Sequence, residues 1–291
     1  MEMEALKRID KIVIRLEGIR ERKTEGREKE TGANEKKSDM VTKQEAGQDN
    51  CREPLYETEH ILNMWKPFSF HTGSDYEYFP SGPVYLLLNR FIRLIVYLLF
   101  PWIHKIVFGL KVTGRNNLRK IKGGMVTVCN HVNIIDCVMV ACNMDCRSVC
   151  FPTLESNFKI PVIRHLIRWL GAVPIPKEKG NFLKMMLSIE EYVKDGGIVH
   201  FYPETVMHPY YNGIRGFRRG AFVTAYDCNV PIVPYVITYR NPGPVLKHFK
   251  KKPCLTMHIL PPVYPDIRVN KRVETERLKQ EVFTAMRKYF E

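Results

Sequence analysis

The segment MVTVCNHVNIID, residues 125–136, decides the fold. Its first five residues form an apolar run with the length and composition of a buried strand, and Asn130 then favours a turn. His131 therefore follows a strand end, where open α/β sheets bind their ligands. Asp136 comes after four intervening residues, so its carboxylate can fix the imidazole tautomer while the other ring nitrogen accepts a proton from a hydroxyl. The same spacing also fits a histidine at a helix start with an aspartate in the first turn.

Charge is distributed unevenly along the 291 residues. Residues 1–50 hold 12 Lys/Arg and 12 Asp/Glu, and the remainder holds 33 against 19, so the net charge of +14 belongs to residues 51–291. This surplus predicts an anionic partner: a nucleic acid, a membrane surface or a phosphorylated substrate. The eight cysteines show no paired C-x-x-C spacing, and the opening residues are charged rather than typical of a secretory signal, which favours a reducing, cytosolic environment.

Two segments precede the part of the chain that is rich in strands. Residues 1–50 are predicted to be a charged tail, helical at first and then a linker almost free of large apolar side chains. Residues 51–110 are predicted to be a membrane-associating helical segment, because residues 84–109 (VYLLLNRFIRLIVYLLFPWIHKIVFG) are the most apolar of the chain. The uncharged centre is shorter than the roughly 20 residues of a spanning helix, and Pro101 predicts a kink. These features favour a helix in the headgroup layer or a helical hairpin in one leaflet, with a buried core helix as the alternative.

From residue 111 onward, strand and helix patterns alternate. The predicted strands cover residues 125–129, 147–151, 171–175, 198–202, 231–237 and 254–260, and the predicted helices cover residues 134–144, 158–170, 180–194, 217–228 and 273–290. This alternation predicts an α/β fold, with a mixed sheet flanked by helices, over residues 111–291. Pro231 and Pro234 place the fifth of these strands at a sheet edge or a bulge.

Three further blocks follow the His131 block in order: GAVPIPK at residues 171–177, FYPET at 201–205 and VPIVP at 230–234. Together the four blocks resemble those of the glycerolipid acyltransferases of the PlsC-like, 1-acylglycerol-3-phosphate O-acyltransferase type. That family has an Asn-His-x4-Asp block, a Gly-led strand ending in Arg, a Phe-Pro-Glu-Gly block and a Val-Pro-x-x-Pro strand. The resemblance covers about residues 111–240.

The resemblance implies a membrane-associated O-acyltransferase, on the cytosolic face, that acts in phospholipid biosynthesis. It would move a fatty acyl group from a thioester of coenzyme A or acyl carrier protein to the hydroxyl of a lysophospholipid, above all 1-acylglycerol-3-phosphate. His131 would be the general base and Asp136 its orienting carboxylate, and the substrate hydroxyl itself would attack. Glu204 would position the polar head of the acceptor, with a turn carboxylate as the alternative role. The thioester is a substrate, so the resemblance implies no bound cofactor or metal.

The chain departs from the family pattern in the segments that would bind the acceptor. Thr205 replaces the glycine of the third block, and Val206 and Met207 replace a Thr-Arg pair whose arginine would bind the acceptor phosphate. Lys177 replaces the arginine of the second block. We therefore expect Arg215, together with Lys177, to contact the phosphate from other points, since a guanidinium binds phosphate through two parallel hydrogen bonds.

Two alternatives stay open. The same chemistry could serve a non-phosphate acceptor, an alcohol or an amine, because the Thr-Arg pair is missing. A protein of a different class, a basic α/β protein that binds nucleic acid without catalysis, would also have this charge. No recognisable nucleic-acid module is present, however, and the aromatic residues cluster with long aliphatic runs. A nucleic-acid partner is therefore not expected.

Overall fold

The computed structural model describes residues 70–119, 121–144, 148–161, 163–243, 247, 250 and 252–291. These residues all belong to the same compact unit of the chain. The predicted charged tail and residues 51–69 of the predicted membrane segment lie outside the described residues.

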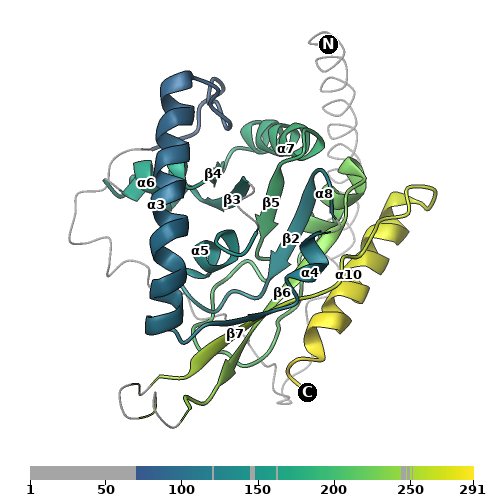
Figure 1. Cartoon of the computed structure of the whole chain (residues 1–291). Helices are drawn as coiled ribbons and strands as arrows, with labels where there is room; N and C mark the ends of the chain where they lie inside the picture. The colour runs from purple at the N-terminus through teal and green to yellow at the C-terminus, as the bar shows by residue number, and fades with distance from the viewer. Residues whose placement is uncertain are drawn as a thin grey trace, which may run out of the picture. The chain divides into compact units, whose positions relative to one another are not determined.

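A seven-stranded mixed sheet forms the centre of this unit (Figure 1). In spatial order its strands are β1 (Lys111–Thr113), β7 (Cys254–Ile259), β6 (Ile232–Arg240), β2 (Met125–Cys129), β5 (Ile198–Phe201), β3 (Val149–Leu154) and β4 (Ala172–Ile175). Neighbouring strands are parallel except β6 and β7, which are antiparallel. The predicted α/β fold with a mixed sheet is therefore confirmed.

Helices cover both faces of the sheet (Figure 1). One face packs against α7 (Lys179–Lys194), α8 (Gly220–Cys228) and α10 (Lys271–Arg287), and the other packs against α4 (Asn116–Arg119), α5 (Asp136–Ala141) and the long α3 (Pro83–Val107). Side chains alternate between the faces of a strand, so Val126 of β2 belongs to the first core and Met125 to the second.

Most boundaries agree with the sequence patterns, and the differences have local causes. The predicted helix over residues 158–170 is divided into a 3-10 turn, η1 (Glu155–Lys159), and α6 (Ile163–Trp169). Pro161 lies between them, and the residue before a proline is disfavoured in helical geometry; Ile160 is extended. The short elements β1 and α4 were not predicted, because three or four residues show no periodicity.

The strand with two prolines lies inside the sheet, so its predicted edge position is wrong, but the predicted irregularity is present. Tyr235 pairs with Ile259 whereas Ile232 pairs with Val263, so three steps along β6 face four along its partner. Pro234 lies within this interval. In a strand, residues two apart direct their N–H groups to the same side, so an N–H group at position 234 would point, like that of Ile232, toward the bulged partner segment. Proline has no N–H group, and its absence there breaks no regular strand pairing.

Within the predicted membrane segment, α3 is one continuous helix of 25 residues that runs through Pro101. Of the two arrangements expected for residues 84–109, the structure therefore shows a single helix and not a helical hairpin. Only Val96 and His104 of this helix are buried, which also excludes the core-helix alternative. At 1.5 Å per residue the helix is about 37 Å long, and it is long and apolar enough to cross a membrane.

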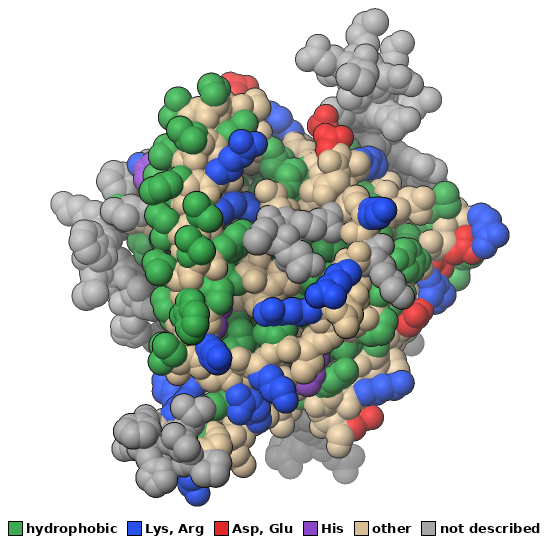
Figure 2. All heavy atoms as spheres, viewed as in Figure 1, with side chains coloured by type: hydrophobic (Ala, Val, Ile, Leu, Met, Phe, Trp, Pro, Cys, Tyr) green, Lys and Arg blue, Asp and Glu red, His purple; other side chains and the backbone are tan. Residues whose placement is uncertain are grey.

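The outward side of α3 is covered with apolar side chains (Figure 2). We call this surface the α3 apolar face; it consists of Val84, Leu86, Leu87, Leu88, Phe91, Leu94, Ile95, Leu98, Leu99, Trp102, Ile103, Ile106 and Val107. The inner side is polar near its start and holds the helix to the sheet layer. Tyr85 donates to the carbonyl of Arg168 (3.1 Å), and Arg93 donates to that of Val149 (3.0 Å).

Candidate active site

His131 and Asp136 form the pair that their spacing predicts. β2 ends at Cys129, the chain turns, and Asp136 begins α5. His131 Nδ1 lies 2.8 Å from Asp136 Oδ2, with the carboxylate fully buried and 23% of the imidazole side chain exposed. An ionised carboxylate only accepts hydrogen bonds, so Nδ1 holds the proton and Nε2 has the free lone pair. Asp136 also lies in the first turn of α5. The orienting carboxylate and the helix-start aspartate, which the spacing predicted as alternatives, are therefore the same residue.

The carboxylate of Asp136 is held on both of its oxygens. Oδ2 accepts from the backbone N–H groups of Val132 (3.1 Å) and Asn133 (3.3 Å) as well as from His131, and Oδ1 accepts from the hydroxyl of Tyr202 (2.6 Å). A buried charge is costly unless it is hydrogen-bonded in this way. The carboxylate therefore has a single orientation, and it transmits that orientation to the imidazole.

Asn130 fixes the start of the turn. Its buried side chain accepts from the N–H of Ile237 (2.8 Å) and donates to the carbonyl of the same residue (2.9 Å). This amide pair continues the contact of β2 with β6 one residue beyond the end of β2. It explains why an asparagine, and not merely any turn residue, precedes His131.

Tyr202 is a site residue that the sequence analysis missed. Its ring stacks on the imidazole of His131, with 4.0 Å between centroids and 18° between planes. Burial and then the charge of Asp136 raise the pKa of Tyr202 well above its ordinary value, so the phenol remains a donor. A signal was present, because Tyr202 occupies the place of the phenylalanine in the Phe-Pro-Glu-Gly block.

Glu204 lies beside His131 on a turn that follows β5. Tyr202 accepts from the N–H of Thr205 (3.0 Å), which closes a β-turn with Pro203 at its favoured second position. Glu204 is buried, and burial raises its pKa to about 7, although the backbone N–H groups of Arg215 and His131 act in the opposite direction. Near neutral pH this carboxyl group can therefore either accept a hydrogen bond or donate one.

Arg215 lies on the loop that joins this turn to α8. Its backbone N–H faces Glu204 Oε1 (3.4 Å), and its guanidinium contacts the ring of His208. His208 in turn donates its backbone N–H to the carbonyl of His131 (2.9 Å). The structure thus brings four predicted residues together, namely His131, Asp136, Glu204 and Arg215.

Lys177 lies apart from this group. It is exposed, two residues beyond β4, at the same edge of the sheet as His131. β5 and β3 separate β4 from β2, so the two strand ends are about 14 Å apart at a spacing of about 4.8 Å per strand. Burial acts to raise the pKa of Glu155, but hydrogen bonds from Thr72 lower it, and the charge of Lys177 adds a smaller effect in the same direction.

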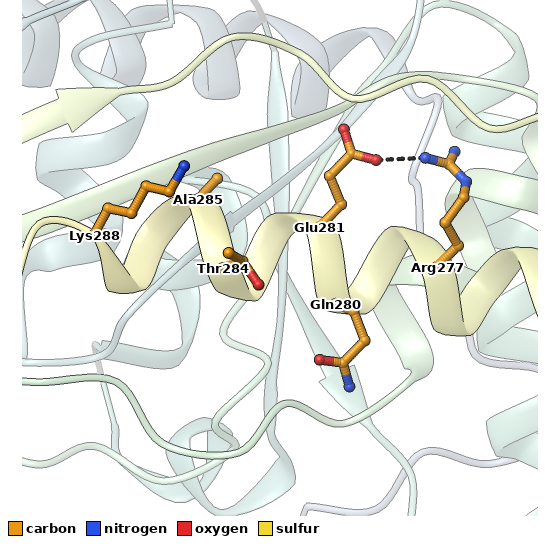
Figure 3. A pocket seen from close by; sticks show the side chains of 6 residues that line it. All are labelled: Arg277, Gln280, Glu281, Thr284, Ala285 and Lys288. Atoms are coloured by element: carbon orange, nitrogen blue, oxygen red, sulfur yellow. Dashed lines mark hydrogen bonds and ion pairs between the residues drawn. The ribbon is translucent and has the colours of Figure 1, made fainter.

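Two further observations concern other kinds of site among the described residues. No group of three or more His, Cys, Asp or Glu side chains there could hold a metal ion. A surface hollow on α10 is lined by Arg277, Gln280, Glu281, Thr284, Ala285 and Lys288 (Figure 3). Five of these residues belong to α10 and Lys288 is its C-cap, and Arg277 forms an ion pair with Glu281.

Comparisons with known proteins place the dyad within a matched region. Residues 109–238 match the protein family described as Acyltransferase. Over 140 residues the chain is 31% identical to the 1-acyl-sn-glycerol-3-phosphate acyltransferase BAT2, chloroplastic, of Brassica napus, a match that covers 46% of this chain and 38% of that protein. The chain therefore spans well under half the length of this relative. Among solved structures it is similar to the 1-acyl-sn-glycerophosphate (LPA) acyltransferase PlsC of Thermotoga maritima, with a TM-score of 0.46, 19% identity, and coverage of 72% of this chain and 80% of that one.

Proposed function

We propose that this chain, whose residues 109–238 match the family described as Acyltransferase, is a membrane-associated O-acyltransferase of phospholipid biosynthesis. It transfers a fatty acyl group from an acyl thioester to the hydroxyl of a lysophospholipid, above all 1-acylglycerol-3-phosphate. The observation that supports this most directly is the His131–Asp136 pair, a partly exposed imidazole bound through Nδ1 to a buried carboxylate.

The dyad supplies general-base catalysis. Nε2 of His131 takes the proton of the acceptor hydroxyl while the hydroxyl oxygen attacks the thioester carbonyl carbon. The new oxygen–carbon bond forms, the carbon–sulfur bond breaks, and the departing thiolate takes up a proton, which the imidazolium can return. Asp136 stabilises the imidazolium and keeps its ring in place. No acyl-enzyme forms, so the two substrates must be bound together.

The groups next to the dyad are suited to hold the acceptor. Glu204 orients a polar group of the acceptor beside His131, and the guanidinium of Arg215 contacts a phosphate. Lys177, from its exposed place at the same sheet edge, adds a point charge for a phosphate further out. A second candidate, an acyltransferase with a non-phosphate acceptor, is favoured by one observation: apolar Val206, two residues after Glu204, is 44% exposed where the pattern has a polar residue.

The α3 apolar face supports the membrane part of the proposal. Thirteen large apolar side chains of one helix are exposed, more than a water-soluble surface normally gathers. Lys250 and Lys252, which are described residues of the basic run at 247–252, add attraction to anionic lipid of about 1 kcal/mol each. We place the domain on the cytosolic face, where coenzyme A thioesters and acyl carrier protein are the available donors.

The test is product analysis with the purified full-length chain. The protein is mixed with anionic liposomes, acyl-CoA or acyl carrier protein thioesters, and a panel of lysophospholipids and neutral alcohols, and the products are identified by mass spectrometry. We expect an acylated lysophospholipid, and we expect His131→Ala to lower turnover by about 10³-fold, within the range of general-base catalysis. The thermal unfolding midpoint of the variant should stay close to that of the wild type.

Turnover that survives in His131→Ala would refute the assignment of the base. An acylated neutral alcohol as the preferred product would favour the second candidate. Binding of the protein to duplex DNA, with an affinity that falls steeply as salt rises and without acyl transfer, would favour the nucleic-acid alternative.

A further inference from the structure

Tyr202 touches both members of the dyad, yet the mechanism above assigns it no step. Its hydroxyl donates to Asp136 Oδ1 (2.6 Å), the oxygen opposite the one that binds His131. Its ring lies against the imidazole at 4.0 Å. One side chain therefore restrains the carboxylate and the imidazole at the same time.

The surrounding structure fixes Tyr202 in this position. β5 pairs with β2 in parallel, with Phe201 beside Val128, so the next residue of each strand also lies at this sheet edge. The turn closed by Thr205 begins at Tyr202 and sets its backbone. His200 packs edge-on against the same ring at 4.7 Å. His200 is itself held by Thr127, whose Oγ1 is 2.7 Å from Nδ1.

We propose that Tyr202 is a positioning residue that tunes the basicity of the dyad as well as its geometry. This inference rests on the proposed function, because it assigns Tyr202 a role in the same proton transfer. The negative charge of Asp136 favours a protonated imidazole. A phenol that donates to the other carboxylate oxygen takes up part of that charge, so the carboxylate attracts a second imidazole proton less strongly.

Several titratable groups face the dyad, and Glu204 is one that competes with this effect. The groups that face the dyad are Asp136 and Cys137 of α5, Cys129 of β2, His200 of β5, Tyr202 and Glu204 beyond β5, His208 and Arg215 of the following loop, and Tyr239 of β6. Burial lowers the pKa of His200 to about 3 and raises the pKa values of Cys137 and Tyr239 to about 12, so these groups are neutral near pH 7. The pKa of Glu204, raised to about 7, falls in the working range.

The test compares Tyr202→Phe with the wild type and with a matched control. The substitution removes one oxygen and keeps the stacked ring, and it restores the residue of the family pattern. The control is Tyr226→Phe, which removes a hydroxyl that donates to the carbonyl of Val269 (2.8 Å) at the surface. We expect Tyr202→Phe to lower kcat about tenfold, the effect of one hydrogen bond to a charged group, with both KM values unchanged within about twofold. The acidic limb of its kcat/KM profile should move to higher pH by about half a unit.

An activity-independent measurement separates this inference from the proposed function. The ¹⁵N resonances of the His131 ring are followed against pH in the full-length chain, with His131→Gln used for assignment. The titration midpoint should be higher in Tyr202→Phe than in the wild type and in Tyr226→Phe, also when Glu204→Gln is present in every protein. Coincident titrations of Tyr202→Phe and wild type would overturn the inference. If no thioester is turned over, the proposed function fails while this comparison still decides the role of Tyr202.

Discussion

The turn from β2 to α5 and the loop from β5 to α8 meet at the same imidazole, but they are built differently. In the turn, Asn130, His131 and Asp136 are tied by hydrogen bonds of 2.8 to 3.3 Å to the sheet and to one another. The loop contains two non-glycine residues in the left-handed region, Thr205 (φ 66°) and Tyr210 (φ 63°), and both are exposed. Under the proposed function, this difference assigns proton transfer to the turn and acceptor binding to the loop.

The largest expected effect is in the turn. Asp136→Asn keeps the shape of the side chain, but an amide cannot accept from Nδ1–H and from Tyr202 as a carboxylate does. By analogy with the aspartate of serine-protease triads, kcat should fall by about 10³- to 10⁴-fold, with the acceptor KM little changed. The control is Asp195→Asn, at the amino end of β5 and hence the opposite edge of the sheet. If Asp136→Asn changed only the acceptor KM and left kcat unchanged, the roles assigned to the turn and the loop would be wrong, because the turn would then bind the acceptor.

An intermediate effect is expected in the loop. Arg215→Ala should raise the KM for a phosphate-bearing acceptor by about 10- to 100-fold, the value of a hydrogen-bonded charge pair, and should leave the KM for a neutral alcohol unchanged. Arg219→Ala is the matched control, since its guanidinium donates to Thr275 on α10 instead (3.2 Å). Lys177→Ala should have a smaller effect in the same direction. If Arg215→Ala hardly changes KM and Lys177→Ala changes nothing, the phosphate assignment is wrong.

The smallest effect concerns the strain in the loop. Thr205 is β-branched, and the left-handed region costs such a residue about 1–2 kcal/mol. Thr205→Gly should therefore raise the free energy of unfolding by about 1 kcal/mol, measured by urea denaturation. Asn229→Gly is the control, because asparagine tolerates its φ of 53° and should gain less. Equal gains would show that the conformation of Thr205 is not strained.

The fold and the dyad could be predicted because both are local in the sequence. The apolar run of β2, its Asn130 stop and the spacing to Asp136 lie within twelve residues, and strands alternate with helices from there on. Tyr202 could not be predicted in the same way, because its contact with Asp136 depends on the order of strands, in which β5 lies beside β2. Strand order is a property of the whole sheet.

The acceptor residues show the same limit. Arg215 was expected near the phosphate because it lies on the loop that follows Glu204, and the structure brings it to Glu204 through a loop whose path no periodicity reveals. Lys177 was expected there because it replaces the arginine of the second block, and it lies three strand positions away. The resemblance pointed to both cations, but the sheet order and the loop path show that their distances from the dyad differ.

The hydrogen bonds on the inner side of α3 affect how the active site would encounter its lipid substrate. Tyr85 and Arg93 bind this helix to carbonyl groups of α6 and β3, so it is not a flexible tether. With the α3 apolar face in a bilayer, the domain would keep one height and one tilt above the lipid headgroups. The protein and the acceptor would then meet by lateral diffusion in the plane of the membrane. The rate of their encounter would depend on the surface density of the lysolipid rather than on its bulk concentration.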